Sequence, residues 1–202
     1  VDPTAKRFTS AQLQLVEGPN VITAVGTDLA GNIGRAEITL ILDTRAPQLV
    51  ITAPAADACL DAQSLEVRGT ANDDRLDAIT VTIGATTVPA VVTGSNWTAT
   101  IPVVEGVLLI TVRATDSLGH EETVTRTVTI DRTAPVVEII ESGAPFTATL
   151  LNRPVALLVR AADATVTATL DGQPYTSGTT IATEGSHTLS VVARDCAGHL
   201  TP

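Results

Sequence analysis

The chain is built from repeats, and their spacing restricts the folds that it can adopt. Glu-Gly pairs begin at Glu17, Glu105 and Glu184, so the copies lie 88 residues apart (17 to 105) and then 79 (105 to 184). Eleven residues after each glutamate, an aspartate opens an Asp-x-x-Gly turn: Asp28, Asp116 and Asp195. Fifteen residues after the first two of these, Asp43 and Asp131 begin Asp-Thr-Arg-Ala-Pro and Asp-Arg-Thr-Ala-Pro. Agreement at so many fixed offsets predicts tandem copies of one structural unit.

The residues around the turns alternate with a period of two, which is typical of strands. The segments before the turns, 21–27, 109–115 and 188–194, place apolar side chains on one face and mostly polar ones on the other. No segment has apolar residues at helical spacing. In the middle copy, strands are predicted over residues 49–51, 65–70, 79–83, 88–92, 97–101, 108–115 and 123–130. About seven short strands in such a unit predict an all-β chain of tandem immunoglobulin-like β-sandwich repeats.

Prolines mark the predicted boundaries between units. Ala46-Pro47 and Ala134-Pro135 divide the chain into residues 1–46, 47–134 and 135–202, and proline keeps a linker stiff. Residues 1–46 supply the last strands (E to G) of a first repeat, 47–134 a complete repeat, and 135–202 a third repeat that lacks its last strand. A half-sandwich exposes its core face, so two interpretations stay open. Either the chain is a piece of a longer array, or a neighbouring molecule supplies the missing strands.

The composition restricts the core and the partners. Apolar residues make up 44% of the chain and aromatic residues 2%, so the cores are expected to consist of Val, Ile, Leu and Ala. A lone aromatic residue precedes each Glu-Gly pair (Phe8, Trp97 and Tyr175), and we interpret it as a core plug; the alternative is a sugar-binding platform, which needs several exposed rings. The net charge of −10 disfavours nucleic acid and anionic membranes as partners. No apolar run is long enough for membrane insertion of this segment.

The first copy carries the motifs Glu17-Gly18-Pro19-Asn20 and Asp28-Leu29-Ala30-Gly31-Asn32. With the Asp-x-x-Ala-Pro segment, this pattern resembles the bacterial Ig-like tandem repeats of extracellular surface adhesins and secreted multidomain proteins. The later turns depart from it, because they end in Gly119-His120 and Gly198-His199. The resemblance covers essentially the whole chain and implies an extracellular location, either on a bacterial surface or secreted.

The same resemblance implies two functions. The first is a structural spacer in a stalk, filament or adhesin, whose partners are the neighbouring repeats, other copies in a filament, or a host or cell-surface ligand. The second is an accessory carbohydrate- or wall-binding module of a secreted hydrolase. No catalytic site is expected, because His120, His187 and His199 lack a nucleophile in a recognisable context and lack His-x-x-x-His spacing. No cofactor is required by either function.

Aspartates gather at the predicted junctions between units. In an Ig-like sandwich the loops that meet the preceding unit bring Asp43 towards Asn72, Asp73, Asp74 and Asp116, and Asp131 towards Asp163 and Asp195. Calcium takes six to eight oxygen ligands, and some adhesins that these repeats resemble stiffen their junctions with calcium. The competing interpretation is that Asp28, Asp116 and Asp195 hydrogen-bond the backbone of their own turns. No Asp-x-Asp-x-Asp-Gly loop is present, and both interpretations stay open.

The two cysteines are predicted to meet at the second junction. Cys59 lies between the first two strands of the middle unit, at the end from which the chain leaves. Cys196 lies in the Asp-x-x-Gly turn of the third unit, at the end that faces the middle unit. A disulfide needs Cα atoms within about 7 Å, and it persists in an oxidising compartment. The sequence therefore predicts a Cys59–Cys196 staple between units, with two separate thiols as the alternative.

Overall fold

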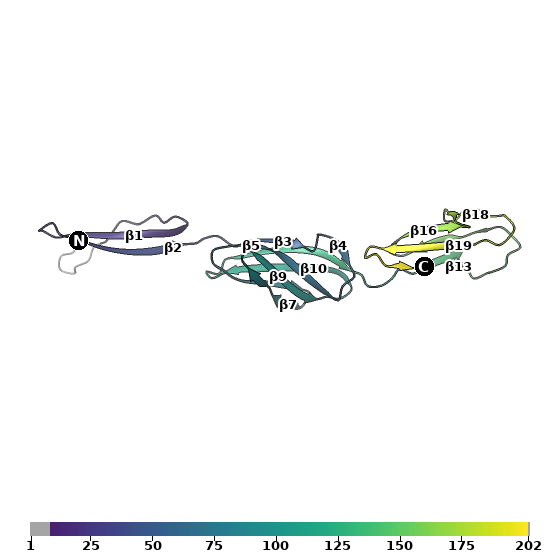
Figure 1. Cartoon of the computed structure of the whole chain (residues 1–202), viewed down its shortest axis with the longest axis horizontal. Helices are drawn as coiled ribbons and strands as arrows, with labels where there is room; N and C mark the ends of the chain where they lie inside the picture. Colours follow the sequence, from purple (N-terminus) through teal and green to yellow (C-terminus); the bar gives the residue numbers. More distant parts are fainter. Residues whose placement is uncertain (1–8, 202) are drawn as a thin grey trace.

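The computed structural model describes residues 9–201 and shows an all-β chain, which confirms the predicted fold class. None of these residues is helical, so the described part of the chain contains no helix that could cross a bilayer. The strands fall into three groups in chain order, and the groups follow one another along one long axis (Figure 1). We call them the N-terminal hairpin (β1–β2), the middle unit (β3–β11) and the third unit (β12–β20).

The middle unit is a sandwich of two sheets. One sheet has the order β3-β5-β9-β8 and the other the order β4-β11-β10-β6-β7. With β3 as strand A, these orders are A-B-E-D and A′-G-F-C-C′, the arrangement of an immunoglobulin-like sandwich. The strands are β3 (Gln48–Ala53), β4 (Ala58–Leu60), β5 (Ser64–Asn72), β6 (Leu76–Ile83), β7 (Thr86–Pro89), β8 (Val91–Thr93), β9 (Asn96–Pro102), β10 (Gly106–Asp116) and β11 (Glu121–Ile130).

Most predicted strands of the middle unit lie within observed ones, with two differences. The predicted strand 88–92 is two strands, because the chain passes from the edge of one sheet at β7 to the edge of the other at β8. The short strand β4 was not predicted. It pairs in parallel with the end of β11 through Thr129↔Cys59, and three residues are too few to show a period of two.

The core of the middle unit is aliphatic with one aromatic plug. Val67, Val81, Ile101, Ile110 and Val112 are fully enclosed, as the alternating pattern of their strands predicts. Trp97 is also buried, with 2% of its surface exposed, so its predicted role as a plug agrees with its position. Gly69 lies opposite Trp97 in the β5–β9 ladder. A side chain at Gly69 would overlap the indole ring and the carbonyl oxygen of Val50, so the plug requires glycine there.

Arg126 interrupts the apolar face of β11, and the structure gives the reason. Its guanidinium donates hydrogen bonds to the carbonyl oxygens of Pro54, at 2.5 Å, and Ile51, at 2.8 Å. These carbonyls lie where the chain leaves β3 on its way to β4 in the opposite sheet. Backbone carbonyls enclosed at such a crossing need donors, and Arg126 supplies them from the neighbouring strand. The side chain thus ties strand A to strand G.

The N-terminal hairpin consists of β1 (Gly18–Thr27) and β2 (Ile33–Leu42). Its register, Gly18↔Leu42 to Thr27↔Ile33, equals that of β10 and β11 after a shift of 88 residues, Gly106↔Ile130 to Thr115↔Glu121. The hairpin is therefore the F–G hairpin of an immunoglobulin-like unit. A strand E was also predicted before it, but residues 9–17 form no strand, and the predicted plug Phe8 lies outside the described residues.

The third unit repeats the strand pattern less completely. Its sheets have the orders β13-β12-β15, β14-β18 and β17-β16-β19-β20. The last strand was predicted to be absent, but the two residues of β20 pair with β19 through Ala193↔Thr201 and Arg194↔Leu200. The strands are β12 (Val137–Glu141), β13 (Ala144–Pro145), β14 (Val155–Ala156), β15 (Leu158–Ala161), β16 (Ala164–Leu170), β17 (Gln173–Pro174), β18 (Thr180–Ile181), β19 (Leu189–Asp195) and β20 (Leu200–Thr201).

Candidate functional site

The Asp-x-x-Gly turns share one hydrogen-bonding scheme. In the middle unit, Asp116 Oδ1 accepts from the backbone N–H groups of Leu118 and His120, both at 2.8 Å, and Oδ2 lies 2.7 Å from His120 Nδ1. Gly119 closes the turn with a φ of 93°, a conformation that glycine adopts without strain. Asp28 and Asp195 make the corresponding bonds to their own turns. Each aspartate therefore organises the backbone of its own turn, as the second interpretation proposed.

The residue four positions after the aspartate completes the turn. In the hairpin, Asn32 Nδ2 donates to Asp28 Oδ2 at 2.8 Å, and in the later turns a histidine Nδ1 takes this place. The departure from Gly-Asn to Gly-His thus replaces one side-chain donor by another. The hydrogen bond to Asp116 raises the pKa of His120. Burial opposes ionisation of Asp116, but the bonds from His120 and the backbone outweigh it and lower the pKa of this carboxyl.

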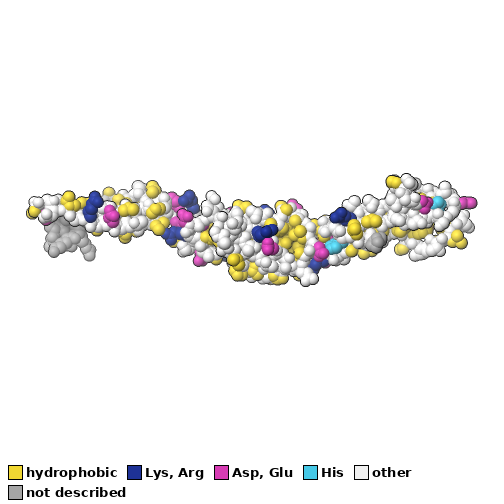
Figure 2. Space-filling model, viewed as in Figure 1, with side chains coloured by type: hydrophobic (Ala, Val, Ile, Leu, Met, Phe, Trp, Pro, Cys, Tyr) yellow, Lys and Arg dark blue, Asp and Glu magenta, His cyan; other side chains and the backbone are white. Residues whose placement is uncertain are grey.

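The first junction brings most of the predicted residues together. Asp43 lies with Asp116 and His120 in a cluster whose ligand-type atoms are all within 4.8 Å of one another. Asp43 also lines one small cleft with Asn72, Asp73 and Asp74. The space-filling view shows acidic and basic side chains side by side where the hairpin meets the middle unit (Figure 2).

Arg75 contacts two of the carboxylates at the first junction. Arg75 Nε lies 3.8 Å from Asp43 Oδ2, and the Arg75 backbone N–H donates to Asp73 Oδ1 at 2.6 Å. The other oxygen of Asp43 accepts from the backbone N–H of Arg45 at 3.3 Å. Arg75 therefore places a positive charge beside Asp43 and holds Asp73 through its backbone N–H.

The Glu-Gly motif clamps the linkers, a role that was not predicted from the sequence. Glu17 accepts hydrogen bonds from the Thr44 backbone N–H at 3.1 Å and hydroxyl at 2.9 Å, and Arg45 Nε lies 3.3 Å away. The Thr44 bonds, led by the backbone one, lower the pKa of Glu17. In the middle unit, Glu105 accepts from the Thr133 hydroxyl at 2.6 Å. The available signal was the fixed separation of 26 residues between Glu-Gly and Asp-x-x-Ala-Pro, because the threonine partner follows that aspartate by one or two residues.

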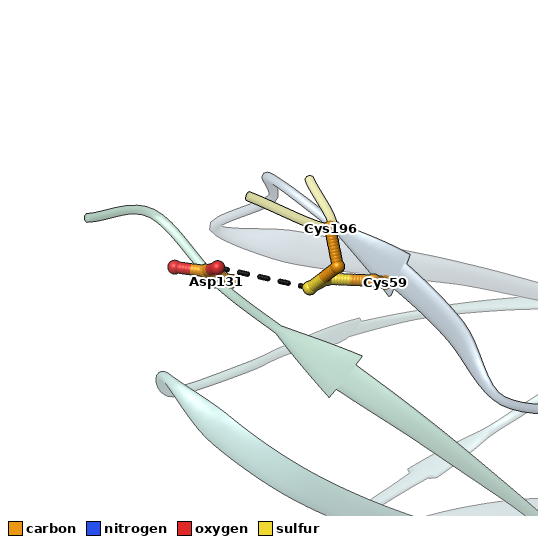
Figure 3. Close-up of side chains that lie close together, drawn as sticks. All are labelled: Cys59, Asp131 and Cys196. Atoms are coloured by element: carbon orange, nitrogen blue, oxygen red, sulfur yellow. Dashed lines mark hydrogen bonds between the residues drawn. A yellow bond between two sulfur atoms is a disulfide. The ribbon is translucent and has the colours of Figure 1, made fainter. Parts of the chain in front are cut away.

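The second junction contains the disulfide. Cys59 of β4 is joined to Cys196 of the β19–β20 turn, with Cα atoms 5.7 Å apart (Figure 3). This is the pair that the sequence placed at one junction. Asp131 Oδ2 lies 3.8 Å from Cys196 Sγ, and since a disulfide sulfur has no hydrogen to donate, this approach is a van der Waals contact. The Asp131 backbone N–H donates to the Leu60 carbonyl at 3.0 Å, which fixes the start of the linker beside Cys59.

A histidine forms a second link across this junction. His199 Nδ1 lies 2.8 Å from Asp195 Oδ2 of its own turn, and Nε2 lies 3.2 Å from Asp61 Oδ2 of the middle unit. The bonds to Asp61 and then Asp195 raise the pKa of His199. Both ring nitrogens face carboxylates, so the charged imidazolium, which carries two N–H groups, satisfies both contacts.

The predicted calcium ligands of the second junction are only partly brought together. Asp131 and Asp195 lie in one cluster with His199. Asp163 occupies the tight turn between β15 and β16, with a φ of 53°, and it belongs to no such cluster within residues 9–201. Each oxygen of Asp195 already accepts a hydrogen bond from its turn. At both junctions the carboxylates thus contact N–H groups, Arg75 and histidines of the chain itself, and calcium binding stays a prediction.

Comparison with known proteins adds a family likeness for the middle unit. The family model described as glucodextranase, domain B, matches residues 47–132. No curated protein sequence matches the chain significantly.

Solved structures resemble the chain at low identity. Fibronectin(III)-like modules of Clostridium thermocellum CbhA are 19% identical over 77% of this chain and 90% of theirs, with a TM-score of 0.43. A 1.5-MDa bacterial ice-binding adhesin is 17% identical over 92% of this chain and 72% of its own, with a TM-score of 0.41. An engineered protein is 24% identical over 42% of this chain, with a TM-score of 0.37, and the match spans 20% of that protein.

Proposed function

We propose that these residues form a structural spacer of an extracellular bacterial protein, as part of a stalk, filament or adhesin, and that they carry no catalytic site. The observation that carries the proposal is the construction of the two junctions. Glu17 and Glu105 clamp the linkers, and the second junction is also tied by a disulfide. A spacer must hold successive units in a fixed orientation, and this chemistry serves that purpose.

Three further observations support the proposal. The strand groups follow one another along one axis (Figure 1), so each repeat adds length. A disulfide between units persists outside the cell, in agreement with an extracellular location. The histidines at both junctions are engaged as donors to turn aspartates, which gives them a structural role. The partners of such a segment are neighbouring repeats, other copies in a filament, or a surface ligand held at a distance.

Small-angle X-ray scattering of the 202-residue chain tests the spacer function. We expect the distance distribution of one elongated particle, and we expect the maximum dimension to shorten in the Glu17→Ala/Glu105→Ala double variant, because the unclamped first linker bends while the disulfide still ties the second junction. A wild-type chain that scatters as a flexible ensemble, with no change in the double variant, would refute the proposal.

The second candidate is an accessory module of a secreted hydrolase, and the match of residues 47–132 to a glucodextranase domain favours it. Sugar binding by stacking needs exposed rings. Trp97 is buried and Tyr175 is half-buried, with its hydroxyl oxygen 2.9 Å from the Leu157 carbonyl oxygen and 2.8 Å from that of Thr179, so neither ring is a fully exposed platform. Affinity electrophoresis through gels that contain soluble glucans decides between the two: retardation supports the accessory module, and unchanged migration supports the spacer.

A further inference from the structure

The disulfide closes a covalent loop around most of the chain. Cys59 and Cys196 are 137 positions apart, and residues 60–195, from β5 to β19, lie inside the loop. Tension applied to the two ends of a chain follows the shortest covalent path. Here that path runs along residues 1–59, crosses the S–S bond and continues from residue 196.

From this topology we infer that the Cys59–Cys196 disulfide shields residues 60–195, most of the middle and third units, from mechanical load, so that this part of the backbone bears no tension while the bond is intact. The inference rests on the spacer function proposed above, because shielding matters only in a segment that carries force. It goes beyond that function, because a rigid spacer needs no protection of its folded units.

The loaded path crosses the middle unit along strands that are already extended. β3 and β4 follow one another along the length of this unit (Figure 1). β3 is held by its ladder with β5, β4 by its parallel pairs with β11, and the segment between them by Arg126. An extended strand has little length left to release, since a residue spans at most about 3.6 Å. Tension therefore meets almost no slack in the middle unit.

The second linker also lies inside the loop. Residues 131–136, with the Glu105 clamp on Thr133, are bypassed by the disulfide, and load enters the third unit at Cys196, shortly before β20. The first junction has no such bypass within the described residues. The position in the middle unit that corresponds to Cys196, 79 residues earlier, is Ser117. Load at the first junction therefore passes through the linker that Glu17 clamps.

Reduction removes the shield. A small dithiol transfers two electrons and two protons to the cystine, so that the S–S bond becomes two cysteine thiols and the dithiol becomes a cyclic disulfide. The separation of 137 positions then corresponds to about 480 Å of extensible chain, at about 3.5 Å per residue. Cys196 is exposed and Cys59 half-buried, so the bond is open to the reductant.

Single-molecule force spectroscopy on the 202-residue chain, held by its two ends, tests the inference. For the oxidised chain we expect no unfolding step that draws on residues 60–195. With dithiothreitol we expect added steps that total about 480 Å of contour length. The Cys59→Ser/Cys196→Ser variant should show these steps without reductant, and comparison of the wild type with and without reductant serves as the test if this variant does not fold.

A free-thiol assay on the same sample establishes that the disulfide is intact. Equal contour lengths with and without reductant, in a chain shown to be oxidised, would overturn the shielding. The outcome is separate from that of the scattering experiment. If the chain is elongated in solution but extends fully without reductant, the spacer function stands and the shielding is wrong. If the chain scatters as a flexible ensemble but extends fully only after reduction, the shielding stands and the spacer function is wrong.

Discussion

Substitution of Gly69 by alanine should destabilise the middle unit strongly. A Cβ atom there would lie 2.6 Å from Trp97 Cε2 and would also overlap a second ring carbon and the Val50 carbonyl oxygen. Neither neighbour has room to move, because Val50 lies in the β3–β5 ladder and Trp97 is enclosed by the core. Overpacking of a core costs about 1–3 kcal/mol. Since one neighbour is backbone and the other is a large enclosed ring, we expect the upper end, about 3 kcal/mol.

The assay uses the fluorescence of Trp97, which is the chain's single tryptophan and so reports on the middle unit alone. A loss of about 3 kcal/mol should lower the melting temperature of a unit of this size by roughly 12–24 °C. Gly34→Ala in β2 is the matched control, because nothing lies within 4 Å of a Cβ atom at that position. It should leave the Trp97 transition unchanged. A Gly69→Ala variant that unfolds within about 0.5 kcal/mol of the wild type would show that the packing argument is wrong.

Three further outcomes are expected. The raised pKa of His199 means that its bound proton stabilises the fold fully below the unfolded-state value, near 6.5, and that this stabilisation is lost as the pH rises through the folded value. His199→Asn keeps the turn donor but loses the Asp61 contact, so its melting temperature should fall less above pH 6.5; an unchanged pH profile would contradict this. Glu105→Ala frees Thr133, and 15N relaxation should then show faster motion of the linker amides, whereas Glu184→Ala, the corresponding change in the third unit, should leave these amides unaffected. Because the turn aspartates already accept hydrogen bonds at both oxygens, neither calcium nor a chelator should shift the melting temperature, and a calcium-dependent rise would support calcium binding instead.

The sequence predicted the fold well because the repeats carry the same information more than once. Register in β1–β2 and β10–β11 follows from the offset of 88 residues and from side-chain alternation. Side-chain alternation failed to predict a strand that is very short and a strand boundary where the chain crosses from one sheet to the other. β4 has three residues, and the division between β7 and β8 depends on a crossing at Ala90 rather than on polarity.

At the junctions, the sequence predicted only the contact that follows from strand topology alone, which is the disulfide. Cys59 and Cys196 could be placed together because both loops lie at one end of known strands. The contacts of the acidic residues depend on which hydrogen-bond donors lie beside them in the folded chain. Arg75 reaches Asp43 from the turn after β5, and nothing in the spacing of the aspartates indicates this. The linker clamp by Glu17 depends in the same way on side-chain conformation in the folded state.

The two junctions occupy the same place in the repeat but differ in the bond that holds them, and this difference predicts that salt loosens only the first. At the first junction Arg75 and Asp43 approach to 3.8 Å without being fully buried, and Glu17 faces the exposed Arg45. At an ionic strength of 1 M the screening length falls to about 3 Å, so these attractions weaken. The second junction keeps its disulfide at any ionic strength. We therefore expect 1 M NaCl to increase the motion of the hairpin relative to the middle unit, seen as separate rotational correlation times in 15N relaxation, while the middle and third units still tumble together. Equal loosening at both junctions would mean that the disulfide does not fix the second one, and no loosening at either would mean that the ion pairs do not fix the first.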